Sequence, residues 1–503
     1  MEPRVLLQFL LAVASTGVCC GQLLVAGAML LATTLSTLAD EMVPVCDFFE
    51  PGPVAPATLA AEGIFPQGKT MHIGGYSPSA TPVEQLGGIV PLELARQAGF
   101  TVAGPYYGPF AGAKPMMERA AALGMKVAAR LEVPPALHFS KEVANSALNL
   151  RGARMDAIPE TELRQWVLED MSHFLNNAAI NRAVSCWAIS PEELRWWFKS
   201  ELRYQQAFVK AVNDFDPQHR PVYMYEPNSR STDGLLKTGP GQGFVLEGAY
   251  VHRYGWDVRR SLRINWAMDQ MTGAAAKDHR VVVPGLQLSQ DMPGFTAADL
   301  KSDPTALAWL HRLLRHDVFL AIVRGAQGFQ VWSLHPFRKN LTTYLKLMEG
   351  YGKVFRELLP PTDLQKAILF GQRRKDIAIE VVQGPAAISS APAHGEELDA
   401  GEGKINIRGE TWPSVRLANL AYGDQRVLIL VNSAGEAVRI RLLGIPAAAC
   451  LQTVSGGDVA MVVTQAAGTE VTLEPFAALV LRVSKGTCSQ NPPARGRLPR
   501  KQP

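Results

Sequence analysis

Short apolar runs that alternate with stretches of helical length are the feature that most constrains this chain. Eight such runs lie between Met71 and Pro336, and amphipathic segments separate most of them. Parallel strands need a crossover helix between them, because the chain must return before it can start a parallel neighbour. Eight strand–helix units in about 250 residues match the count and size of a (β/α)8 barrel. The runs are Met71–Tyr76, Phe100–Tyr107, Met125–Val133, Val184–Ser190, Pro221–Tyr225, Phe244–His252, Val281–Leu288 and Gly328–Leu334.

The periodicity changes from helical to alternating beyond Pro361. Seven short segments without an intervening helix favour an antiparallel sandwich. The predicted fold class is therefore α/β, a (β/α)8 TIM barrel followed by a C-terminal antiparallel β-sandwich domain. The seven segments are Ile377–Val382, Val415–Leu420, Arg426–Val431, Val438–Leu442, Ala460–Val463, Glu470–Leu473 and Ala478–Val483.

The predicted domain boundaries follow these changes of pattern. Residues 1–39 form a signal peptide or membrane anchor, and residues 40–69 a segment that wraps the barrel. The barrel takes residues 70–361 and the sandwich residues 362–486. Residues 487–503 are rich in Pro, Gly and Arg and are expected to form a disordered basic tail.

The first 39 residues have the composition of an export signal. The stretch from Val5 to Ala39 has no charged residue, and Thr37–Ala39 places small residues where a signal peptidase reads the chain. A secreted, periplasmic or extracellular location is the prediction. The stretch is longer than a usual signal core, so an uncleaved anchor and association with a membrane remain the alternative.

Composition, motifs and cysteine positions limit which ligands, partners and disulfide bonds we expect. The formal net charge is +4 without a basic stripe, which argues against nucleic acid as a partner. No phosphate loop and no zinc motif occurs, so we expect neither cofactor nor metal. Cys46 and Cys488 are a candidate disulfide pair, whereas Cys186 and Cys450 are expected to be buried, unpaired thiols. The oligomeric state stays open.

Glu192 is the most informative candidate for chemistry. It follows the fourth predicted strand within the run Val184–Glu193, and a helix over Glu192–Phe215 is expected to begin there. Catalytic groups of such barrels lie at the carboxyl ends of the strands. An acidic residue in the first turn of a helix is, however, also favourable for purely structural reasons.

At this point the chain resembles the (β/α)8 glycoside hydrolases that carry a catalytic acid at the end of the fourth strand. Three segments carry the resemblance: Trp187–Glu192, Arg324–Ser333 as an eighth strand with Trp332 as a sugar platform, and Glu474–Arg482 as a closing strand of the sandwich. The resemblance implies that Glu192 is the general acid or acid/base. It also implies a carbohydrate as substrate.

Glycoside hydrolysis usually needs a second carboxyl group. Many proteins of this kind place a glutamate at the end of the seventh strand, where this chain has Gln287. The alternatives are Glu247, inside an apolar strand, Glu226, directly after the fifth strand, and Asp291, in the loop after the seventh. Glu132 ends the third strand, and an ion pair with Arg130 is the preferred interpretation for it. Glu247 is the favoured partner.

Aromatic and polar side chains gather at the predicted strand ends. Sugars offer C–H faces to aromatic rings and hydroxyls to fixed hydrogen-bonding groups, so the gathering predicts a carbohydrate cleft. The residues predicted to bind substrate are Tyr76, Tyr107, Trp187, Tyr250, His252, Gln287 and Trp332; Tyr106, Tyr225 and Tyr254 belong to the same group of strand ends.

Three functions are consistent with this sequence. The leading one is an exported glycoside hydrolase that cleaves O-glycosidic bonds of a polysaccharide or oligosaccharide. A non-catalytic carbohydrate-binding protein is the alternative, because Gln287 cannot replace a nucleophilic carboxylate. A surface or assembly protein that attaches through its sandwich domain is the third.

Overall fold

A computed structural model describes most of the chain. The described residues are 48–106, 109–132, 134, 155–192, 194–226, 230–288, 292–335, 341–359, 364–389, 397–399, 404–406, 410–455, 460–465 and 468–486. The predicted leader, the basic tail, Cys46 and Cys488 lie outside them. Within these ranges no helix combines the length and apolar character that crossing a membrane requires.

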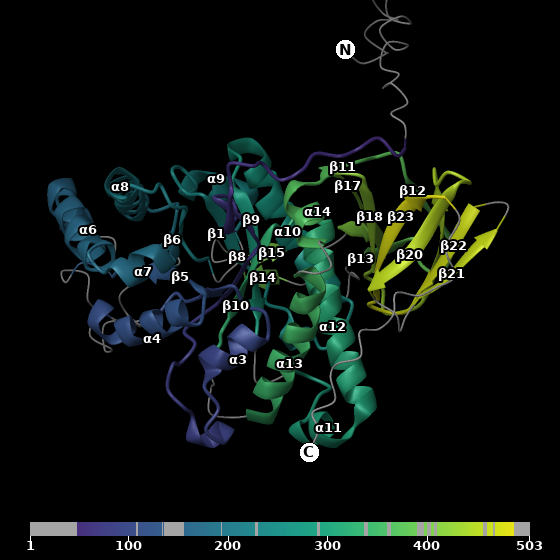
Figure 1. The fold of residues 1–503 in the computed structure, drawn as a ribbon, viewed down its shortest axis with the longest axis horizontal. Helices are drawn as coiled ribbons and strands as arrows, with labels where there is room; N and C mark the ends of the chain where they lie inside the picture. The colour runs from purple at the N-terminus through teal and green to yellow at the C-terminus, as the bar shows by residue number, and fades with distance from the viewer. Residues whose placement is uncertain are drawn as a thin grey trace, which may run out of the picture. The chain divides into compact units, whose positions relative to one another are not determined.

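A ring of eight parallel strands forms the centre of the larger part of the chain, as the apolar runs predicted (Figure 1). Each run contains one strand. The hydrogen-bonded order is β7-β6-β5-β4-β3-β10-β9-β8. The strands are β3 (His72–Gly75), β4 (Val102–Ala103), β5 (Lys126–Arg130), β6 (Val184–Ala188), β7 (Val222–Tyr223), β8 (Phe244–Gly248), β9 (Val281–Gln287) and β10 (Gly328–Trp332).

Backbone hydrogen bonds between β7 and β8 close the ring. Gly243 N–H donates to the carbonyl of Val222 over 2.8 Å, and Gly248 N–H donates to the carbonyl of Glu226 over 2.7 Å. Glu226 and Glu247 face each other as a parallel bridge beyond the end of β7. The (β/α)8 prediction is therefore confirmed by the strand order together with its closure.

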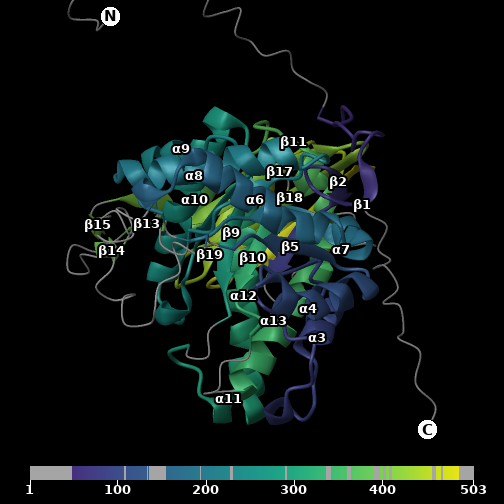
Figure 2. The same ribbon diagram turned by 90° about the vertical axis from the view of Figure 1, so that its left-hand side faces the viewer.

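Helices surround the strands in both views (Figures 1 and 2). Two of them depart from the pattern of the sequence at points that matter for the barrel. The stretch Gln85–Ala98 has the sequence of a single helix, but Gly87, which has a φ of +67°, divides it into η1 and α3. The helices are η1 (Glu84–Leu86), α3 (Pro91–Gln97), α4 (Phe110–Ala122), α6 (Glu160–Leu175), α7 (Ala178–Ala183), α8 (Lys199–Phe215), α9 (Thr232–Thr238), η3 (His252–Tyr254), α10 (Arg259–Asp278), α11 (Ala297–Ser302), α12 (Pro304–Val323), α13 (Leu341–Leu358) and α14 (Leu364–Phe370).

The second difference concerns Glu192. The helix expected to start at Glu192 begins only at Lys199, so the prediction of a helix amino terminus at this glutamate is wrong. A hydrogen-bonded loop replaces its first turns, because buried Glu201 accepts hydrogen bonds from the backbone N–H of Arg195 (2.7 Å) and from its Nε (2.9 Å). The dipole-based explanation of Glu192 is thereby removed.

The segment before β3 contributes two short strands. Strands β1 (Ala60–Ile64) and β2 (Gly68–Thr70) pair in parallel, and Ile64 belongs to the buried cluster inside the ring. Phe65 packs against the same cluster. Because β2 leads directly into the start of β3, this pair fills the amino end of the barrel. The carboxyl ends of the strands are therefore the open side.

The C-terminal part forms the predicted antiparallel sheets. One sheet has the order β11-β17-β18-β23-β20 and the other β12-β19-β22-β21. All seven predicted segments are strands. The strands are β11 (Gln372–Arg373), β12 (Ala378–Gln383), β13 (Ala387–Ser389), β14 (Glu397–Asp399), β15 (Lys404–Asn406), β16 (Thr411–Pro413), β17 (Val415–Tyr422), β18 (Gln425–Asn432), β19 (Val438–Leu443), β20 (Ala449–Ser455), β21 (Ala460–Gln465), β22 (Gly468–Leu473) and β23 (Ala478–Lys485).

The two described cysteines differ in state. Cys186 is buried with a free thiol, as expected, and burial raises the pKa of that thiol to about 12. Cys450 is part of a disulfide bond, so the prediction that it is an unpaired thiol is wrong. Spacing along the chain does not reveal which cysteines meet in space.

A buried ion pair anchors the outer face of β6. The Asp216 carboxylate accepts hydrogen bonds from Arg220 (Nη2, 2.7 Å) and from the indole of Trp187 (2.9 Å), and all three side chains are buried. Burial opposes ionisation of Asp216, but these hydrogen bonds outweigh it and hold the pKa of the carboxyl below its ordinary value.

Replacing Asp216 with alanine should lower the free energy of unfolding by about 3–5 kcal/mol, because it leaves the Arg220 charge buried without its partner. Asp214→Ala is the matched control. Asp214 of α8 pairs with Lys210 and Arg164 at the surface, so its replacement should change the free energy of unfolding little. Urea denaturation followed by circular dichroism measures both. Equal losses in the two variants would contradict the assignment.

Candidate functional site at the carboxyl end of the barrel

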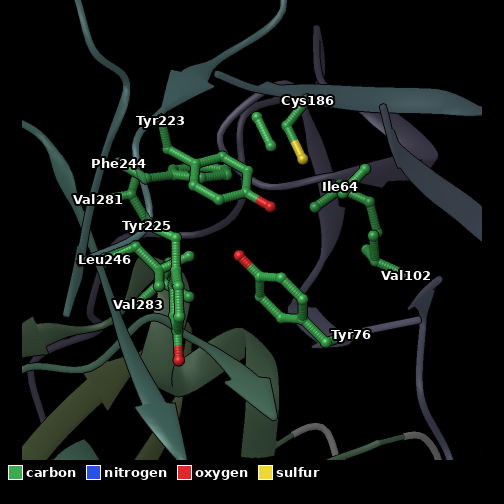
Figure 3. Close-up of a cluster of buried hydrophobic side chains, with 12 residues drawn as sticks. Ile64, Tyr76, Val102, Cys186, Tyr223, Tyr225, Phe244, Leu246, Val281 and Val283 are labelled. Carbon is green, nitrogen blue, oxygen red and sulfur yellow. The ribbon is translucent and has the colours of Figure 1, made fainter. Parts of the chain in front are cut away.

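Alternate residues of each strand point into the ring. The buried cluster inside it takes Tyr223 and Tyr225 from β7 and the segment after it, Phe244 and Leu246 from β8, and Val281 and Val283 from β9 (Figure 3). Because successive side chains of a strand point to opposite faces, their neighbours Glu226, Glu247 and Trp187 point out of the ring. This alternation decides which predicted residues can meet a ligand.

A polar layer crosses the middle of the lumen. The ring nitrogen Nε2 of His72 donates to Oε1 of Gln330 over 3.0 Å, and Gln330 Nε2 donates to the carbonyl of Gly104 over 2.9 Å. Gly74 makes room for this layer, since a Cβ there would lie 2.0 Å from Gln330 Oε1. The lumen is thus packed below the mouth at the level of His72 and Gln330.

Glu192 lies at this mouth, as predicted. The phenol of Tyr76, which follows β3, donates a hydrogen bond to Glu192 Oε1 over 3.1 Å. Tyr76 is fully buried and packs against Tyr225, with ring centroids 4.8 Å apart. Tyr204 of α8 fixes the end of β6 by donating to the carbonyl of Ser190 over 3.0 Å. Glu192 is partly exposed and is therefore accessible to a ligand.

Tyr250, Gln287 and Trp332 meet on the opposite part of the rim. Trp332 and Gln287 are register partners on adjacent strands, and the rings of Tyr250 and Trp332 lie 6.0 Å apart. Both aromatic rings pack on the lumen cluster while staying partly exposed. Gln287 Oε1 accepts a hydrogen bond from the backbone N–H of His252 over 3.2 Å. These three residues form an amphipathic wall.

A cavity of about 550 Å³ opens beside Trp332. Its size is within the range of small-molecule sites. Ser77, Ser79, Tyr106, Ser333 and His335 contribute polar groups to its lining. Tyr106 is buried, which raises the pKa of its phenol, so the hydroxyl stays protonated. Sequence reasoning placed Tyr106 at a strand end but missed Ser77 and His335, which carry no distinctive pattern.

Trp187 does not join the site. Its indole lies outside the ring, against Phe174 at 5.6 Å between centroids and beneath the guanidinium of Arg220 at 4.9 Å. The strand alternation that places Cys186 and Ala188 in the lumen turns Trp187 outward. The prediction of a substrate contact for Trp187 is therefore not supported by its position.

Glu226 and Glu247 are also separated from Glu192 by the strand alternation. Glu226 is buried and forms an ion pair with Arg230, whose Nε and Nη2 both lie 3.0 Å from Glu226 Oε2. Glu247 is fully buried beside the same bridge. Neither side chain points into the lumen, so the favoured second carboxylate is not where the sequence placed it. Tyr107 and Asp291 lie outside the described residues.

His252 is buried behind the rim instead of exposed to ligand. Arg260 of α10 forms a bidentate ion pair with Asp317 of α12, both bonds 2.8 Å, and donates to the carbonyl of Gly255 over 2.7 Å. Burial and the nearby charge of Arg260 lower the pKa of His252 to about 3. His252 is therefore neutral, which removes it as a cationic ligand for an anionic sugar.

Comparisons with known proteins found only distant structural similarities. No protein-family profile and no curated protein sequence matches the chain. Among solved structures it is similar to an alpha-amylase from Anoxybacillus (12% identity, 84% of this chain and 99% of that one, TM-score 0.48). It is also similar to the Geobacillus thermoleovorans alpha-amylase complexed with acarbose (11%, 83% and 99%, 0.43) and to the Bacillus licheniformis trehalose-6-phosphate hydrolase (9%, 83% and 99%, 0.47).

These similarities are too distant to transfer an activity. The (β/α)8 architecture of the chain is established by its own strand order and ring closure. Within the described residues no cluster of three or more His, Cys, Asp or Glu side chains is arranged to hold a metal ion. The chemistry of the site must therefore be inferred from its own side chains.

Two of the buried histidines, His72 and His252, predict how stability depends on pH. Burial lowers the pKa of His72 to about 4, against the opposing hydrogen bond to Gln330, and that of His252 to about 3. In the unfolded chain each takes up a proton near pH 6.5. Below that pH the unfolded state binds more protons, so the free energy of unfolding falls as the pH drops, by up to about 1.4 kcal/mol per pH unit for each histidine.

Urea denaturation at pH 7 and pH 5 tests this expectation. His72→Asn should show a smaller loss between the two pH values than the unaltered protein. His219→Asn is the control, because His219 is exposed and its positive φ of 49° suits asparagine. The same pH dependence in His72→Asn as in the unaltered protein would refute the assignment.

Proposed function

We propose that this protein is a glycoside hydrolase that cleaves O-glycosidic bonds of an oligosaccharide or polysaccharide. The observation that carries the proposal is the position of Glu192, a partly exposed carboxyl group at the open end of a (β/α)8 barrel, hydrogen-bonded to Tyr76 at 3.1 Å. The partly exposed rings of Tyr250 and Trp332 and the cavity beside them supply surfaces for the C–H faces of a sugar. Distantly similar solved structures include alpha-amylases and a trehalose-6-phosphate hydrolase.

Glu192 is assigned the proton-transfer role. A carboxyl group at this place can protonate the leaving glycosidic oxygen and then, as a carboxylate, remove a proton from water. The Tyr76 phenol fixes the orientation of the group, because its ring is buried and held against Tyr225. The proposal gives the role of the second carboxylate to neither Glu226 nor Glu247.

A carbohydrate-binding protein without catalysis is the second candidate. Two observations favour it specifically: Gln287 stands at the end of the seventh strand, and both Glu226 and Glu247 point away from the lumen. Such a protein would retain glycans at the same mouth. The two functions are separated by whether new reducing ends appear.

Glu192→Gln should lower turnover of an unactivated glycan by a factor of about 10² or more, because the amide cannot donate the proton. Reducing-end release from a panel of oligosaccharides and polysaccharides measures the effect, and binding should change little. Glu118→Gln is the comparison variant, since Glu118 is an exposed carboxyl group of α4 that pairs with Lys114 and should retain full activity. Full turnover by Glu192→Gln would remove this residue from the mechanism. Binding without cleavage by the unaltered protein would favour the second candidate.

Tyr76→Phe removes only the hydroxyl that contacts Glu192. Hydrogen bonds to charged groups contribute about 1.5–3 kcal/mol, so kcat should fall roughly 10- to 100-fold while the melting temperature changes little. Tyr422→Phe in the C-terminal sheets is the matched control and should leave kcat unchanged. Steady-state kinetics on the best substrate of the panel decide the outcome. An unaltered kcat in Tyr76→Phe would show that this hydrogen bond does not position the acid.

A further inference from the structure

The exposed tryptophans of this chain are confined to loops at the mouth of the barrel. All nine tryptophans lie within the described residues, and the two with more than a third of their surface exposed are Trp197 (39%) and Trp256 (42%). Trp197 lies in the loop between β6 and α8, five residues after Glu192. Trp256 lies between η3 and α10, in the loop that follows β8. Both loops leave the carboxyl ends of barrel strands.

Trp197 is held in place by buried charges beneath it. The guanidinium of Arg230 lies 5.4 Å from the centroid of its ring, and Arg230 is itself fixed by Glu226. The neighbouring Trp196 packs edge-on against Trp197, with ring centroids 5.8 Å apart. Lys237 Nζ lies 3.6 Å from the ring centroid of Trp196. The indole of Trp197 is therefore supported on its inner side while its outer surface stays accessible.

Side-chain hydrogen bonds hold the described part of the loop that carries Trp197. Buried Glu201 binds the backbone N–H and the side chain of Arg195, and Arg230 Nη2 donates to the carbonyl of Leu194 over 3.4 Å. Glu226 thus has a role in this arrangement, because its carboxylate orients the arginine that lies under the indole. An exposed indole on a fixed loop keeps little conformational freedom to lose when a ligand binds.

Trp256 is supported in the same way by other elements. Its ring packs against Phe295 at 4.8 Å and edge-on against Trp309 of α12 at 5.6 Å. Gly294, with a φ of +86°, lets the chain pass close to the Trp256 ring, since a Cβ at this position would lie 2.5 Å from the indole Nε1. Two exposed indoles, each supported on its inner side, therefore lie on loops that leave the carboxyl ends of β6 and β8.

We propose that Trp197 and Trp256 are outer platforms for a polysaccharide chain that extends past the sugar bound at Glu192. The inference rests on the proposed function and adds a substrate class to it, a polymer in preference to a disaccharide. Sugar rings stack on indole faces, whereas a substrate confined to the pocket would not reach either ring. Both loops leave the strand ends at which Glu192 also lies, and this shared end of the barrel selects a glycan over other occupants of an exposed aromatic surface.

Affinity electrophoresis with the full-length Glu192→Gln protein tests the platforms without turnover. Gels contain soluble starch, arabinoxylan, mixed-linkage β-glucan or alginate as the probe. Adding Trp197→Ala or Trp256→Ala should weaken retention by the bound polysaccharide about 3- to 10-fold, and Trp197→Phe should restore part of it. Leu168→Ala is the control, because Leu168 is similarly exposed (38%) but lies on α6.

Steady-state kinetics of proteins that keep Glu192 separate the platform proposal from the proposed function. Trp197→Ala should raise KM for the polymer and leave kcat/KM for a disaccharide or trisaccharide of the same linkage unchanged. The platforms would be overturned if none of the four polysaccharides retained the protein. They would also be overturned if the two tryptophan variants were retained as strongly as the Leu168→Ala control. Cleavage of short glycans in that case would leave the proposed function standing. If retention depends on the tryptophans but the protein with Glu192 intact releases no reducing ends, the platforms stand and the proposed function fails.

Discussion

The hydrogen bonds that close the ring between β7 and β8 determine the character of the mouth. They pair the backbone of Glu226 with Leu246 and Gly248, and so set the register of the last pair of strands. Since side chains alternate along a strand, this register turns Tyr225 and Leu246 inward and Glu226 and Glu247 outward. The mouth therefore presents tyrosines where a different register would present carboxylates.

The outward-facing carboxylates stabilise the loops around the mouth. Glu226 pairs with buried Arg230, which contacts the loop between β6 and α8 and the ring of Trp197. Arg260 and Asp317 brace the loop after β8 in a comparable manner. A buried charge without its partner would be strongly unfavourable, so these pairs hold the loops in one arrangement. Buried ion pairs thus contact both of the loops that carry the exposed aromatic rings.

The strands were predictable from the sequence, and the partners of single residues were not. Apolar runs report burial along the chain, so each of the eight runs contains a barrel strand and each of the seven later segments a strand of the C-terminal sheets. Glu192 was found for the same reason, because it follows a strand end. The start of α8, in contrast, depends on Glu201 binding back to Arg195, a contact that no local pattern reveals.

The (β/α)8 order, the C-terminal sheets and the acidic residue after the fourth strand all follow from the pattern of residues along the chain. Strand pairing in the folded protein decides which side chains enter the lumen, because a shift of one residue in any strand reverses all of its faces. That decision excludes Trp187, Glu226 and Glu247 from the mouth and brings Tyr76 to Glu192 across 116 positions of sequence. The Glu226–Arg230 pair lies only four residues apart, yet its role under Trp197 follows from a loop that precedes it. Contacts between distant segments are set by packing, which periodicity along one strand does not encode.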